Sequence, residues 1–190
     1  MHAAPIYLDH AATTPVDPRV LAEMLPFFTQ RFGNPSSVYA TGRDARAGLD
    51  NARGTLARIL HAHPRELIFT SGATEANNLA LRGVAELQRR NATGLYHIVT
   101  SQIEHHSVLH TAQALARDGF DVTFVAPDRD GLIHIDAVEE ALRPETCLVS
   151  IMYANNEIGT VQPIRAIAEL VHANTRALFH TDAVQAAGTI

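Results

Sequence analysis

The sequence predicts an α/β fold with a mostly parallel sheet flanked by helices. Short apolar runs alternate along the chain with segments of helical periodicity, and each run is largely apolar throughout. Such runs are typical of strands that are buried on both faces of a parallel sheet. Strands alternating with helices imply right-handed crossovers. The chain of 190 residues, with 46% apolar and 18% charged residues, is long enough for one domain with a sizeable core.

Five apolar runs are expected to be strands, and five apolar stripes are expected to be helices. The strands are 67–70, 97–100, 122–125, 148–151 and 177–180. The helices are centred on 45–59, 76–87, 108–116, 136–142 and 164–171. Asp136 followed by Glu139 has the form of a capping box, and Pro163 suits the first turn of the last helix. Segments 7–18 and 32–37 hold turn residues and are expected to be irregular.

Composition argues against several classes of function. The 20 acidic and 15 basic residues give a net charge of -5, which disfavours a nucleic-acid partner. We expect no membrane span and no secretory signal, and one cysteine excludes an internal disulfide framework. These features together predict a cytoplasmic protein. All 15 basic residues are arginine, so chemistry that needs an amine side chain requires an amine from outside this sequence.

The segment Thr70–Ala76 reads as the end of a strand, a glycine and the start of a helix. Backbone N–H groups at a helix N-terminus, with the Thr74 hydroxyl beside them, favour a phosphate group. The helix dipole adds only about 0.3–1 kcal/mol at an exposed site, so hydrogen bonds must supply the rest of the free energy of phosphate binding. An ordinary turn capped by Ser71 or Thr74 is the alternative, and spacing alone favours it.

The segment Glu104–Ser107 follows the strand expected at 97–100. Because ligands sit at the carboxyl ends of strands in open α/β sheets, His105 could stack on an aromatic ligand or move protons near neutral pH. A surface histidine without a role is the alternative. His106 and His110 are four residues apart, but no third ligand lies at a useful spacing, so no metal site is expected.

Two more polar groups follow later strands. Asn156 lies after the strand at 148–151 and offers an amide that both donates and accepts, although asparagine is equally common in turns. Asp182 ends the fifth strand and could hold a protonated pyridine nitrogen, or it could cap a helix. A phosphate-binding turn, an imidazole, an amide and a carboxylate at the ends of four strands suit pyridoxal phosphate (PLP), whose chemistry the protein orients and tunes.

Several motifs resemble the class V aminotransferase group, and most closely its cysteine desulfurases, which supply sulfur for iron–sulfur clusters. They are YLDHAATTP (7–15), FGNPSS (32–37), FTSGATE (69–75), Glu104–His105, NNEIG (155–159), and Asp182 with Gln185. The resemblance covers essentially the whole chain. It implies the large domain of a PLP-dependent transferase of fold type I, in a truncated form.

The resemblance also implies roles for six residues. Ala73, through its backbone, and Thr74 would hold the PLP phosphate; His105 would stack on the ring and act catalytically in proton transfers; Asn156 and Gln185 would bond the ring hydroxyl; and Asp182 would pair with the ring nitrogen. By the same resemblance, residues 1–20 belong with the small domain and 21–190 form part of the PLP-binding large domain. The rest of both domains is expected to be absent.

Two family residues are missing from the sequence. The lysine that forms the Schiff base lies in a Ser-x-His-Lys segment, which would follow Ile190, and the persulfide cysteine would lie further on. No lysine of this chain can therefore bond the cofactor covalently. Cys147 is expected to be a buried structural thiol and no substitute for the persulfide cysteine.

The family activity is removal of sulfur from L-cysteine, leaving alanine and an enzyme persulfide, and this chain alone is expected to be inactive. The implied partners are L-cysteine, a complementing C-terminal half or the rest of the parent chain, a second copy in a homodimer of the complete enzyme, and an iron–sulfur scaffold protein as sulfur acceptor. The alternatives are a non-catalytic binding or regulatory remnant, or a fragment of a selenocysteine lyase or other class V aminotransferase.

Overall fold

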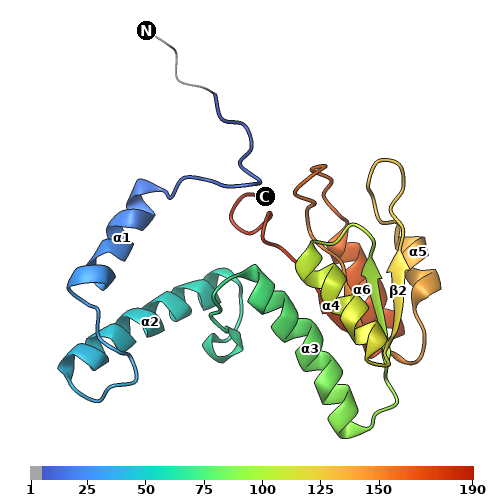
Figure 1. The fold of residues 1–190 in the computed structure, drawn as a ribbon, viewed down its shortest axis with the longest axis horizontal. Coiled ribbons are helices and arrows are strands. Elements are labelled where there is room, and N and C mark those ends of the chain that lie inside the picture. The colour runs from blue at the N-terminus through green and yellow to red at the C-terminus, as the bar shows by residue number, and fades with distance from the viewer. Residues whose placement is uncertain (1–5) are drawn as a thin grey trace. The chain divides into compact units, whose positions relative to one another are not determined.

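The computed structural model describes residues 6–190, which fall into two compact units divided between Phe69 and Thr70. The first unit is helical, and the second is a sheet with helices on both faces (Figure 1). The domain boundary expected at residue 20 falls inside helix α1 (Pro18–Thr29), and the assignment of 1–20 to a small domain stays a prediction. Within residues 6–190, no helix is both long enough and apolar enough to cross a bilayer.

The second unit confirms the predicted α/β fold class. Its four strands are all parallel, in the order β2-β1-β3-β4. The strands are β1 (His97–Ser101), β2 (Asp121–Val125), β3 (Thr146–Ser150) and β4 (Leu178–His180). Each lies within two residues of its predicted position. The agreement follows from the continuous apolar runs, which only a sheet covered on both faces can bury.

The strand predicted at 67–70 is wrong. The segment carries no strand assignment and directly follows the short 3-10 helix η1 (Pro64–Glu66). Residues 67–69 belong to the first unit, whose described elements are all helical, so no strand is available there to pair with them. Ile68 accordingly remains 69% exposed. An apolar run identifies a possible strand, but hydrogen bonding to a neighbour makes it one.

Helices cover both faces of the sheet and enclose two cores. Side chains alternate across each strand, so Ile98 and Leu148 pack into one core while Val99 and Val149 pack into the other. The helices α3 and α4 pack on the first core, and α5 and α6 on the second. Their bounds are α3 (Ala73–Asn91), α4 (His106–Arg117), α5 (Ile135–Ala141) and α6 (Ile164–Asn174). Each fully buried aliphatic side chain contributes about 1.5–3 kcal/mol.

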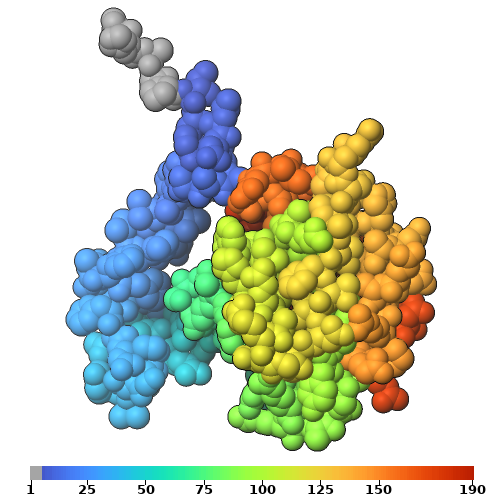
Figure 2. Space-filling model, turned by 45° about the vertical axis from the view of Figure 1, so that its right-hand side comes forward, coloured from blue at the N-terminus to red at the C-terminus, as the bar shows by residue number. Residues whose placement is uncertain are grey.

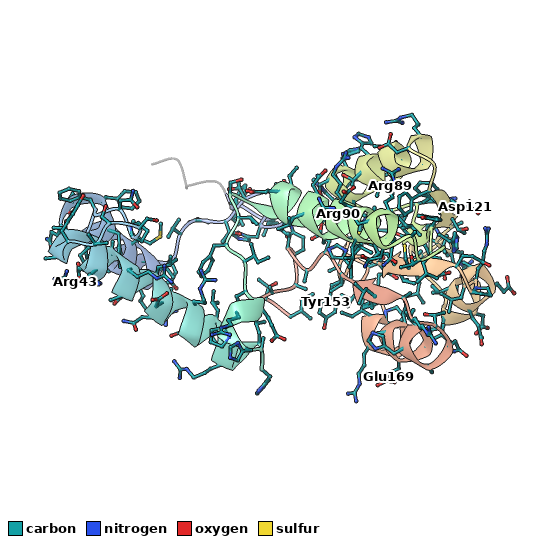
Figure 3. The ribbon with its side chains drawn as sticks, turned by 90° about the horizontal axis from the view of Figure 1, so that it is seen from below. Arg43, Arg89, Arg90, Asp121, Tyr153 and Glu169 are labelled. Carbon is teal, nitrogen blue, oxygen red and sulfur yellow. The ribbon has the colours of Figure 1, made fainter. Side chains whose placement is uncertain are left out.

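The figures show the same layers. Arg90 on α3 and Glu169 on α6 lie on opposite sides of the strands (Figure 3). The space-filling view shows green atoms of α3 adjoining yellow-green atoms of α4, which pack against each other (Figure 2). These two helices therefore form one continuous layer over β1 and β3.

The order of the strands creates a switch point between β1 and β3. After β1 the chain crosses through α4 on one face to reach β2, and after β3 it crosses through α6 on the other face to reach β4. The two loops therefore leave neighbouring strands in opposite directions. Crevices of this kind, at the carboxyl ends of strands, are where ligands bind in open α/β sheets.

Helix starts depart from the sequence predictions in three places. The capping box at Asp136 is wrong, because α5 begins at Ile135 after an N-cap His134 that makes no side-chain cap bond. Pro163 is the N-cap residue of α6 and precedes its first turn. The helix α1 was not expected. Asp17 caps it by accepting from the N–H of Arg19, and the proline that follows Asp17 suits a first helical position.

In the first unit, an irregular loop at 32–37 packs against the start of α2 (Ala40–Ile59). Two glycines permit this approach. A Cβ on Gly33 would lie 2.2 Å from the carbonyl oxygen of Thr41, and a Cβ on Gly42 would lie 2.3 Å from that of Ser37. Backbone atoms cannot move aside as a flexible side-chain end can. The loop conformation therefore requires a residue without a side chain at both positions.

We predict that Gly42→Ala destabilises the chain by about 1–3 kcal/mol, the usual cost of overpacking. Gly54→Ala in the same helix is the matched control, because its Cβ would meet nothing within 4 Å. Ala is the better helix former, so the control should gain about 0.5–1 kcal/mol. Urea denaturation followed by circular dichroism measures both. Equal midpoints for the two variants would show that the loop does not press on α2.

Candidate functional site

The N-terminus of α3 carries no side-chain cap. Its N-cap is Gly72, whose extended backbone makes no cap bond, so capping by Ser71 or Thr74 is excluded. The Glu75 carboxylate instead accepts from the N–H of Ser71 at 2.7 Å and from its Oγ at 2.6 Å, which lowers the pKa of Glu75. The first N–H groups of a helix have no partner within the helix, so those of Ala73 and Thr74 can receive an anion.

The junction between β1 and α4 presents an imidazole. His105 is exposed and is the N-cap residue of α4, where its Nδ1 accepts from the backbone N–H of Ser107 at 3.1 Å. The same Nδ1 lies 2.8 Å from Ser107 Oγ. His106 and His110 follow on the helix with ring centroids 4.9 Å apart. Within residues 6–190, no group of three side chains is arranged to hold a metal ion.

The segment after β4 buries a carboxylate. Asp182 is only 7% exposed, and its Oδ1 accepts from the N–H of Val184 at 3.1 Å. Its Oδ2 accepts from Asn77 Nδ2 at 2.8 Å. Its carbonyl oxygen accepts from the N–H of Tyr153, which ties the segment to the loop after β3. Two donors, one of them on α3, therefore fix the carboxylate, which can hold a positive charge where it lies after β4.

Asn77 is a site residue that the sequence reasoning missed. It is 4% exposed on α3, and its Nδ2 donates to Asp182 Oδ2 and to Ser107 Oγ, both at 2.8 Å. One amide thus joins α3, α4 and the segment after β4. The sequence held one signal for it. Asn77 lies four residues before Leu81, which is fully buried, so a polar side chain occupies the inward face of the helix.

Glu104, the residue before His105, is a second buried carboxyl group. Glu104 is 5% exposed, and its Oε1 accepts from Ser101 Oγ at 2.5 Å and from the N–H of Met152 at 2.9 Å. These bonds join the end of β1 to the segment after β3 across the switch point. Its Oε2 has no hydrogen-bond partner among the described residues. Burial raises the pKa of Glu104 to about 7, and the nearby charge of Asp182 adds to the rise.

The predicted site residues are brought together unevenly. Thr74 and His105 line one pocket of about 390 Å3, and Asp182 is joined to His105 through hydrogen-bonded side chains. Ala73 begins α3 beside Thr74. Asn156 is exposed in the loop after β3, and its buried neighbour Asn155 anchors that loop through the carbonyl of Ile103. Gln185 is half-buried in the turn after Asp182. The remaining pocket lining is Asn78, Arg82, His106, Ser107, His110 and Thr111.

Cys147 has the environment expected of a structural thiol. It is 2% exposed at the start of β3, and its Sγ donates to the carbonyl oxygen of His97 at 3.3 Å. Burial raises the pKa of Cys147 to about 11. Because the thiolate is the reactive form, this cysteine is unreactive near neutral pH, and its role in packing is confirmed.

The arrangement suits a ligand with three features. An uncapped helix N-terminus receives an anionic group, a buried carboxylate receives a positive charge, and an imidazole at the end of β1 can cover an aromatic ring. No lysine occurs in the sequence, so the site has no side-chain amine of its own.

Comparison with known proteins gives concordant matches. Residues 6–190 match the family described as Aminotransferase class-V. The chain is 52% identical to "Putative cysteine desulfurase IscS 1" of Bacillus subtilis (strain 168), covering 97% of this chain and 48% of that protein. It is 48% identical to "Cysteine desulfurase, mitochondrial" of Saccharomyces cerevisiae, covering 98% and 37%. The chain thus spans about half or less of the length of these curated relatives.

Two solved structures share the fold. A NifS-like protein superposes with a TM-score of 0.89 and is 41% identical, covering 95% of this chain and 49% of that one. A structure titled "SspA in complex with cysteine" has a TM-score of 0.88 and 43% identity, covering 95% and 51%. In both, the similarity extends over about half of the solved chain.

The raised pKa of Glu104 predicts a pH dependence of stability. The unfolded chain releases this proton near pH 4.5 and the folded chain near pH 7. Folding stability therefore falls as the pH rises through this window, by roughly 3 kcal/mol at about 1.4 kcal/mol per unit. Glu104→Gln keeps an acceptor oxygen but cannot ionise, so its free energy of unfolding should fall less over the same window.

Urea denaturation at several pH values measures this difference. The contributions of His97 and His180, whose pKa values burial lowers, are common to both proteins and cancel in the comparison. Glu139→Gln, at an exposed position of α5, is the matched control and should leave the slope unchanged. Parallel pH profiles for Glu104→Gln and the parent would mean that folding does not raise the pKa of Glu104.

Proposed function

The chain belongs to the class V aminotransferase family, and we propose that it is the N-terminal portion of a PLP-dependent cysteine desulfurase. Such an enzyme converts L-cysteine to L-alanine and retains the sulfur as a persulfide. The observation that carries the proposal is the buried carboxylate of Asp182, joined through Asn77 and Ser107 to the imidazole of His105. The identity of about 50% to cysteine desulfurases supports this choice of activity within the family.

The residues present fit PLP as the cofactor. The N–H groups of Ala73 and Thr74, at the uncapped end of α3, would receive its phosphate. The buried Asp182 would hold the positive charge of a protonated ring nitrogen, and the exposed ring of His105 would cover the pyridine ring. The loops that carry Asn156 and Gln185 would supply hydrogen bonds to the ring hydroxyl. Bound PLP withdraws electrons from the α-carbon of an amino acid.

Each residue then has a task in the reaction. With PLP bound, Asp182 would keep a proton on the ring nitrogen, because a fixed negative charge favours the protonated form. His105 holds a proton at the substrate face. The α3 N-terminus would anchor the phosphate and so orient the cofactor. The lysine and the sulfur-accepting cysteine would come from a second polypeptide or from the remainder of a longer chain.

The implied partners follow from the same proposal. L-cysteine would be the substrate, consistent with the cysteine complex of one structural relative. The complementing part of the enzyme, and a second copy in a homodimer, would cover apolar side chains that the helical unit exposes. Those side chains on α1 are Val20, Leu21, Met24, Leu25, Phe27 and Phe28. An iron–sulfur scaffold protein would accept the sulfur.

We predict that this chain forms alanine from L-cysteine and PLP only when a lysine-bearing partner is supplied. The partner is the C-terminal half of a full-length relative, purified and mixed with this chain. Asp182→Asn should lower the rate on the order of 100-fold, the usual loss when a fixed charge is removed from an active site. Alanine is measured by mass spectrometry.

The matched control is Asp121→Asn, at the amino end of β2 and away from the switch point (Figure 3). It should retain the parent rate. A folded mixture that binds PLP and forms no alanine would contradict the proposed activity. Equal rates for Asp182→Asn and the parent would contradict the role of the carboxylate.

A further inference from the structure

The amide of Asn77 has a fixed orientation. Its Nδ2 lies 2.8 Å from Asp182 Oδ2, and a carboxylate oxygen only accepts, so the nitrogen must face it. The second hydrogen of the same nitrogen points to Ser107 Oγ, also at 2.8 Å. Ser107 Oγ is therefore an acceptor in this bond. The buried carboxylate thus fixes Asn77 as the donor in its hydrogen bond to Ser107.

The hydroxyl of Ser107 has one hydrogen, and its direction follows. Because Oγ accepts from Asn77, its hydrogen is available to His105 Nδ1 at 2.8 Å. The backbone N–H of Ser107 also donates to that nitrogen, at 3.1 Å. Two donors meet at Nδ1, so this nitrogen carries a lone pair and no hydrogen. A neutral imidazole has one N–H, which is then at Nε2.

We infer that Asn77 and Ser107 are positioning residues that fix His105 as the Nε2–H tautomer and tie its ring to Asp182. The inference rests on the proposed function, in which His105 and Asp182 contact the same cofactor ring. It specifies which ring nitrogen of His105 carries the proton. The resting imidazole presents an N–H donor from the nitrogen that faces away from Ser107.

The arrangement also makes the two contacts interdependent. Asn77 is on α3, Ser107 is on α4 and Asp182 follows β4, so a shift of any one element alters the hydrogen bonds of the other two. Thr111 reinforces the α4 side, because its Oγ1 donates to the carbonyl oxygen of Ser107 at 2.8 Å. The carboxylate and the imidazole are therefore set by one network.

The tautomer can be measured on this chain without cofactor, partner or activity. Long-range proton–nitrogen NMR of the histidine rings, at a pH where they are neutral, distinguishes Nε2–H from Nδ1–H. The parent should show His105 as Nε2–H. Ser107→Ala removes the hydroxyl donor and should shift the tautomer ratio toward Nδ1–H by about two- to tenfold, the range expected for one hydrogen bond. Ser107→Thr keeps the hydroxyl and should restore the parent ratio.

Asn77→Ala should shift the ratio in the same direction, because it frees the Ser107 hydroxyl to rotate. Asn174→Ala is the matched control, because this exposed amide on α6 donates to the carbonyl oxygen of Leu170 and should leave the ratio unchanged. If Asn77→Ala does not fold, the Ser107 pair still decides. A parent His105 in the Nδ1–H form, or an unchanged ratio in folded Ser107→Ala, would overturn the inference. Failure of the complemented alanine assay, with the NMR result as expected, would count against the proposed function only.

Discussion

Burying the carboxylate of Asp182 is the constraint on which the rest of the site depends. A carboxylate removed from water needs hydrogen-bond donors to replace its hydration. Asn77 and the backbone of Val184 supply them, and Asn77 does so from a helix more than a hundred residues earlier in the chain. The donors meet the carboxylate only when α3 and α4 pack over β1 and β3. Formation of the site is thus coupled to closure of one core.

The sheet order gives this network its position. Since β1 and β3 are neighbours whose loops leave over opposite faces, the residues that follow them border one crevice. Glu104 links the two sides of that crevice, because it accepts hydrogen bonds from the end of β1 and from the segment after β3. It is buried with one oxygen lacking a partner among the described residues, and its raised pKa reflects the cost of that placement. The residues that hold the strand ends together and the residues that could bind a ligand therefore lie at the same carboxyl end of the sheet.

The sequence allowed the parallel sheet to be predicted and several candidate site residues to be named, because both predictions rest on local patterns. Continuous apolar runs located four strands, and polar residues just after them pointed to His105 and Asp182. The strand predicted at 67–70 is wrong because a strand needs a neighbouring strand to pair with, which a local pattern does not reveal. The start of α1 was missed because Asp17 and the proline after it suit a turn as well as a helix N-terminus. The spacing of Asn77 from Leu81 indicates an inward-facing amide, but its partners Ser107 and Asp182 lie far along the chain and no local pattern identifies them.

We propose above that Asp182 is the group that receives a protonated ring nitrogen. Nitrogen NMR of PLP labelled with 15N in the ring, bound to this chain, tests it most directly. We expect a resonance in the protonated range for the parent, and a shift to the unprotonated range in a folded Asp182→Asn variant. A bound ring that is unprotonated in the parent, or one unaffected by the substitution, would contradict it.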